Sequence, residues 1–117
     1  MSSEIVYLTP PQNDFEEAYL AARHKEGRIY LDEIVRQLPV VPKGHPQEKE
    51  WGLRRHNVQQ LLLHLQEKAP NRILDLGCGN GWLTHQLIAG QKSGSVLGLD
   101  INITELEQAQ RLFAHSR

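Results

Sequence analysis

The stretch ILDLGCGNG at residues 73–81 decides the fold of this chain. Its first four residues form a short apolar run that is typical of a buried strand. Three glycines follow, and residues 82–89 after them carry apolar side chains at helical spacing. A strand that ends in a glycine-rich turn before a helix predicts the start of a βαβ unit, from which parallel sheets are built.

The next residues continue this pattern. Residues 96–100 form a second short apolar run, which ends at Asp100. Asn102 with Glu105, or Thr104 with Glu107, then offers a capping box for a last helix. The order strand, helix, strand, helix predicts an α/β fold that starts a Rossmann-like parallel sheet. Because only residues 101–117 follow the second strand, we expect this sheet to be truncated.

The residues before this unit show a helical pattern. Three helices are expected before residue 70, of which the second ends at Pro39 and the third, long and amphipathic, turns Trp51 inward. The chain is therefore predicted to divide into a helical section over residues 1–70 and the first βαβα part of a cofactor-binding domain over residues 71–117.

Composition excludes several classes of protein. The chain has 117 residues, 39% of them apolar and 23% charged, with a net charge of -1, which describes a single globular domain at most. This charge argues against a nucleic-acid binder with a strongly basic face. No apolar run approaches the roughly 20 residues that cross a bilayer. The lone cysteine and the lack of a secretory pattern predict a cytoplasmic protein, and the six histidines lack the spacing of a zinc site.

The glycine-rich stretch has the features of a binding loop for a charged small molecule. Its glycines remove the Cβ atoms that would keep a ligand from the backbone, and the following helix presents its positive end. Asp100 ends the second strand, about where a carboxylate accepts hydrogen bonds from a ribose diol. Adjacent parallel strands end at the same rim of a sheet, so both features are expected to face one ligand.

The details of the loop indicate which ligand. A dinucleotide-binding loop reads G-x-G-x-x-G, whereas this one reads G-x-G-x-G and has Asp75 two positions before the first glycine. Asp75 would repel a pyrophosphate. S-adenosylmethionine carries no phosphate. Its carboxylate suits the N-terminal end of the helix, its cationic groups suit the acidic side chains, and its ribose suits Asp100.

Residues 72–113 resemble the first cofactor-binding motifs of the class I S-adenosylmethionine-dependent methyltransferases. The resemblance implies that Asp75 and the loop backbone line the methionine end of the cofactor, that Asp100 holds the ribose hydroxyls, and that Ile101 lies against the adenine. The residues predicted to bind the cofactor are Asp75, Gly77, Cys78, Gly79, Asn80, Gly81, Asp100 and Ile101.

The same resemblance implies that much of the fold is missing. Such folds have a sheet of about seven strands, so five strands, the acceptor pocket and the catalytic residues are expected beyond Arg117. We therefore expect this chain to be the N-terminal portion of a longer enzyme and to be inactive by itself. The implied activity is methyl transfer to an unidentified acceptor, more readily a small molecule than a nucleic acid.

Two other functions stay open at this point. One is an NAD-dependent oxidoreductase with a divergent dinucleotide loop, and the other is a non-catalytic binding module that keeps the βαβ scaffold. The bare edges of a short sheet also make self-association plausible. Arg54 and Arg55, with Trp51, are candidates to reach the cofactor carboxylate, although a solvated charged face is the plainer interpretation. Cys78 is interpreted as a small structural residue, since no base is indicated beside it.

Overall fold

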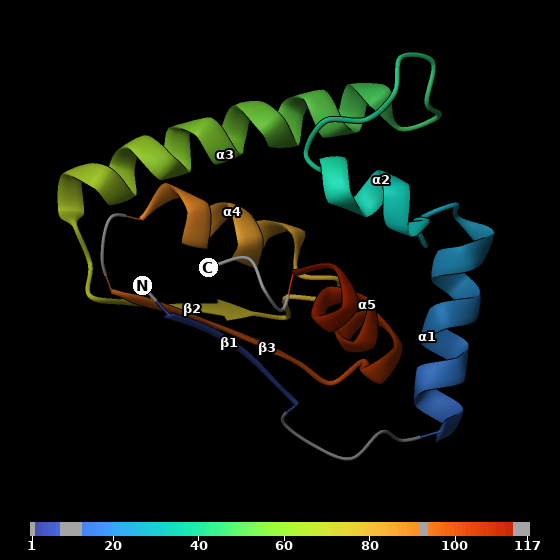
Figure 1. The fold of residues 1–117 in the computed structure, drawn as a ribbon. Helices are drawn as coiled ribbons and strands as arrows, with labels where there is room; N and C mark the ends of the chain where they lie inside the picture. Colours follow the sequence, from blue (N-terminus) through green and yellow to red (C-terminus); the bar gives the residue numbers. More distant parts are fainter. Residues whose placement is uncertain (1, 8–12, 92–93, 114–117) are drawn as a thin grey trace.

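The computed structural model describes residues 2–7, 13–91 and 94–113 (Figure 1). In chain order the elements are β1 (Ser2–Tyr7), α1 (Asn13–Lys25), α2 (Asp32–Gln37), α3 (Glu48–Lys68), β2 (Arg72–Leu76), α4 (Trp82–Gly90), β3 (Ser95–Asp100) and α5 (Ile103–Phe113). The predicted α/β class is confirmed, with a strand-helix-strand-helix unit that follows a helical section.

The sheet is parallel and has β3 at its centre. Ser95 of β3 is aligned with Arg72 of β2 on one side and with Ser2 of β1 on the other, in the order β1-β3-β2. A third strand thus joins the two that the βαβ pattern predicts, and it comes from the start of the chain. The division into domains at residue 70 stays a prediction.

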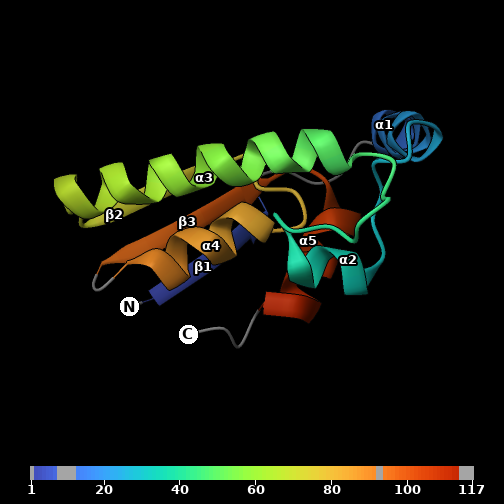
Figure 2. The same cartoon turned by 90° about the horizontal axis from the view of Figure 1, so that it is seen from above.

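One face of the sheet is covered by helices. Figures 1 and 2 show α3 and α4 running along this face. Leu87 and Ile88 of α4 pack with the buried Val96 of β3, and Leu62 of α3 packs against this cluster. On β2 the side chain of Leu76 is 72% exposed, so this strand keeps an open apolar side in the described part of the chain.

A second core joins the helical section to α5. Val35 of α2, Trp51 of α3 and Phe113 of α5 are buried together in it, which confirms that the long helix turns Trp51 inward. Arg111 of α5 donates two hydrogen bonds to the carboxylate of Asp32 at the start of α2, at 2.8 and 2.9 Å. These contacts hold the helical section beside the ends of the strands, where β2 and β3 lead into loops (Figure 1).

Within residues 2–7, 13–91 and 94–113, no helix is long and apolar enough to cross a membrane. The same residues contain no group of three or more His, Cys, Asp or Glu side chains placed to hold a metal ion.

Candidate functional site

The loop between β2 and α4 depends on its glycines. Gly77, Gly79 and Gly81 have φ values of 77°, 54° and 80°, in the left-handed region that side chains disfavour. The backbone N–H groups of Gly77 and Cys78 both donate to the carbonyl oxygen of Leu99 on β3, at 2.7 and 3.0 Å. These bonds hold the loop against the neighbouring strand, so its conformation is set by the sheet.

Asp100 joins the end of β3 to the glycine loop that follows β2. Its carboxylate accepts hydrogen bonds from the backbone N–H of Gly79 at 2.6 Å and from that of Asn102 at 2.8 Å. Bonds from N–H groups to a carboxylate are stronger than those to neutral acceptors. The structure therefore brings the glycine loop and Asp100 together at one rim of the sheet.

A cavity of about 290 Å³ opens between this rim and the helical section. Such a volume lies near the lower end of the usual range for small-molecule sites, roughly 300–1,000 Å³. Of the residues predicted to bind the cofactor, those that line it are Gly77, Cys78, Gly79, Asn80 and Asp100. Those that are not part of its wall are Asp75, Gly81 and Ile101, and Ile101 is 45% exposed.

Asp75 is bound to the helix that follows the loop. Its carboxylate accepts a hydrogen bond from the hydroxyl of Thr84 on α4 at 2.7 Å. Burial raises the pKa of Asp75, the bond from Thr84 opposes this, and the negative charge of Asp100 adds to it. Asp75 thus ties β2 to α4 on either side of the loop, and its contact with a ligand stays a prediction.

Glu105 is a residue of the cavity wall that sequence reasoning missed. The side chain of Asn102 does cap α5, since its Oδ1 accepts a hydrogen bond from the N–H of Glu105 at 3.0 Å. The expected bond from the backbone N–H of Asn102 back to the Glu105 carboxylate, the second half of a capping box, is wrong. This N–H donates to Asp100, and the Glu105 carboxylate lies near Gly79. Glu105 is 7% exposed, burial raises its pKa, and Arg23 at 3.6 Å opposes that rise.

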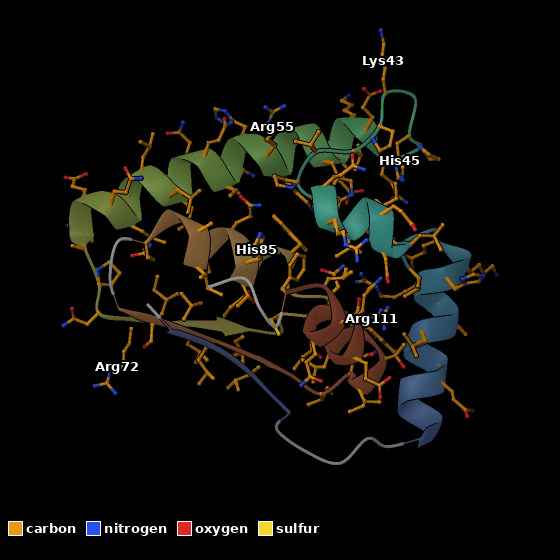
Figure 3. All side chains as sticks on the ribbon, viewed as in Figure 1. Lys43, His45, Arg55, Arg72, His85 and Arg111 are labelled. Carbon is orange, nitrogen blue, oxygen red and sulfur yellow. The ribbon has the colours of Figure 1, made fainter. Side chains whose placement is uncertain are left out.

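The helical section supplies basic and aromatic side chains to the same cavity. The indole of Trp51 makes an edge-on contact with the indole of Trp82 at the start of α4, with ring centroids 5.0 Å apart. The guanidinium of Arg54 lies over the Trp51 ring, 4.5 Å from its centroid. Arg54 lines the cavity, whereas Arg55 is exposed on the outer side of α3 (Figure 3). Helix geometry therefore separates the two candidate arginines.

Cys78 is expected to be unreactive in the folded protein. Burial, with the nearby charges of Asp75 and Asp100, raises the pKa of its thiol to about 12. The reactive thiolate is then scarce near neutral pH, and the side chain is only 7% exposed. A thiol reagent at pH 8 should label the chain at a rate far below that of a free cysteine, and labelling should become rapid in urea. Rapid labelling of the folded chain would contradict the burial of this thiol.

Comparison with known proteins agrees with this arrangement. A family model described as "Methyltransferase domain" matches residues 67–117, which include the glycine loop, β3 and Asp100. The predicted resemblance to methyltransferases is confirmed. No solved structure matches the chain.

Curated relatives of the chain are named as methyltransferases. A trans-aconitate 2-methyltransferase of Pseudomonas aeruginosa is 40% identical over 60 residues, which are 51% of this chain and 22% of that protein. A malonyl-[acyl-carrier protein] O-methyltransferase of Legionella pneumophila is 38% identical over 64 residues, which are 55% of this chain and 21% of that protein. The chain thus spans about a fifth of the length of these relatives.

Proposed function

We propose that this chain belongs to an S-adenosylmethionine-dependent methyltransferase and that its glycine loop and Asp100 bind the cofactor. The observation that carries the proposal is the carboxylate of Asp100, which is fixed by the N–H of Gly79 beside the first turn of α4. A carboxylate offers about four acceptor positions, so Asp100 keeps two for the hydroxyls of a ribose. The cofactor supplies a methyl group that its sulfonium already activates.

The charges around the loop support this cofactor over a dinucleotide. Asp100 and Glu105 both line the cavity, and Asp75 lies behind the loop. These carboxylates favour a ligand with cationic groups and would repel a pyrophosphate. Cys78, Asn80 and the loop glycines would contact the methionine end through their backbone. Direct contacts by Asp75, Gly81 and Ile101 are part of the proposal, although these residues lie outside the cavity wall.

The acceptor is proposed to be a small molecule. Support comes from relatives named for trans-aconitate, which carries carboxylates. The cytoplasm is the proposed location, in agreement with Cys78 as a free cysteine. Self-association through the sheet edges is a further part of the proposal, since β1 and β2 are the outer strands of the described sheet.

Calorimetric titration of the chain tests the cofactor. The experiment uses S-adenosylmethionine, its demethylated product S-adenosylhomocysteine, and NAD as three separate ligands. Saturable binding of the first two, with no heat from NAD, is the expected result. Binding of NAD in preference to them, or failure of both adenosyl compounds to bind, would refute the proposed function.

A further inference from the structure

Two arginines of the cavity wall share one carboxylate. Nη1 of Arg28 donates to Oε1 of Glu50 at 2.8 Å, and Nη2 of Arg54 donates to the same oxygen at 2.8 Å. Arg28 also donates to Glu26 at 3.0 Å. The bond from Arg28 holds the pKa of Glu50 below its usual value, so this carboxylate stays ionised near neutral pH. Glu50 thus bonds to both guanidinium groups, and Arg28 is shared between Glu50 and Glu26.

Arg54 keeps most of its hydrogen-bonding capacity. Its bond to Glu50 is the single hydrogen bond that its side chain makes within the described residues. A guanidinium has five N–H donors in a planar fork, which matches the two oxygens of a carboxylate. The Trp51 ring supports the guanidinium from one side at 4.5 Å and restricts its orientation. The side chain is still 38% exposed, so a ligand can reach it.

The remaining basic residue of the wall is engaged elsewhere. Arg23 forms an ion pair with Glu105 at 3.6 Å and donates to the backbone carbonyl of Arg28 at 3.4 Å. Glu105 and Asp100 make the side of the cavity at α5 acidic, whereas Arg28 and Arg54 make the side at α3 basic. The cavity is therefore polarised, and its basic side lies over aromatic rings.

We propose that Arg28 and Arg54 form a carboxylate-binding site in this cavity. The inference rests on the proposed function, which supplies two sources of such a group: the methionine end of the cofactor and a carboxylate of the acceptor. In either case the carboxylate takes up the free donors of Arg54, while Glu50 continues to hold both guanidinium groups in place. A fork of this kind distinguishes a carboxylate from an uncharged group of similar size.

The test compares two neighbouring arginines. Arg54→Gln removes the charge in the cavity, and Arg55→Gln removes the same charge from the next residue of the helix, on its outer side. Each variant of the full chain is titrated with S-adenosylhomocysteine, with its analogue that lacks the carboxylate, and with tricarballylate as a simple tricarboxylate. Circular dichroism confirms folding. Arg28→Gln serves as the second variant in case Arg54→Gln does not fold.

A cofactor source and an acceptor source give different results. If the site holds the cofactor carboxylate, Arg54→Gln should lower the affinity for S-adenosylhomocysteine by about tenfold or more. The affinity for the decarboxylated analogue should then stay within about twofold of that of the unaltered chain. If the site holds a carboxylate of the acceptor, Arg54→Gln should lower the affinity for tricarballylate alone by about tenfold or more. Arg55→Gln should leave all three ligands within about twofold.

Two outcomes would overturn the carboxylate site. One is equal effects of Arg54→Gln and Arg55→Gln on every ligand, and the other is no binding of any ligand by the unaltered chain. Binding of tricarballylate that depends on Arg54, in a chain that binds no S-adenosylhomocysteine, would support the site while refuting the proposed function. The two proposals can thus fail separately.

Discussion

Replacing Trp51 with alanine is expected to lower the free energy of unfolding by about 3–5 kcal/mol, the usual cost of removing a large buried aromatic side chain. Trp51 is 2% exposed, and its ring contacts those of Tyr30 and Trp82. Its Nε1 donates to the hydroxyl of Tyr30 at 3.0 Å, and that hydroxyl donates to Gln47 at 2.6 Å. The substitution therefore leaves a cavity and also removes one member of a hydrogen-bonded chain.

Urea denaturation followed by circular dichroism measures this loss. The matched control is Leu53→Ala on the same helix, whose side chain is 62% exposed and whose loss should cost well under about 1 kcal/mol. Because Trp51 joins α3 to the start of α4, we also expect the variant to bind S-adenosylhomocysteine less tightly. Similar unfolding midpoints for the two variants would show that Trp51 does not hold the helical section to the sheet.

Asp100→Asn is expected to weaken binding of S-adenosylhomocysteine by about 10- to 100-fold, since each hydrogen bond to a charged group contributes roughly 1.5–3 kcal/mol. An amide keeps one acceptor oxygen and replaces the other with a donor. One of the two N–H groups, of Gly79 or of Asn102, would then face an NH₂ group. Where that group is the N–H of Gly79, the loop would lose one of its bonds to β3, and a ribose would lose an acceptor.

The control for this variant is Glu33→Gln. Glu33 is an exposed carboxylate of α2 outside the cavity wall. Its replacement removes the same charge from the surface, so affinity should change by less than about twofold. Calorimetry compares both variants with the unaltered chain. Unchanged affinity of Asp100→Asn would remove Asp100 from the binding site.

The local part of the site could be predicted from the sequence for a physical reason. A βαβ unit fixes how two strands and their connecting helix are placed, so the glycine loop and Asp100 had to meet at one rim. The βαβ unit leaves few other ways to place the two strand ends. The structure shows the predicted contact, in which the N–H of Gly79 donates to Asp100. The positive φ values of Gly77 and Gly79 follow from the same tight turn.

The contributions of the helical section could not be predicted in this way. Arg54 and Arg55 are neighbours on one helix, and the way α3 packs, with Trp51 against Trp82, decides which of them faces the cavity. Glu105 matched a local capping pattern, but its carboxylate lies beside Gly79, where Arg23 from a distant helix offsets its charge. Such contacts depend on how separate elements pack, which local sequence patterns do not encode.

The place of β1 in the sheet has a consequence for folding during synthesis. Tyr7 pairs with Asp100, so nearly the whole chain separates the two strands of this ladder. Pairing across such a distance closes a large loop and is slow compared with the formation of helices. While a ribosome is still making β3, β1 lacks the strand with which it pairs, and α1 to α4 can already form. β1 can therefore join the sheet only after β3 has left the ribosome.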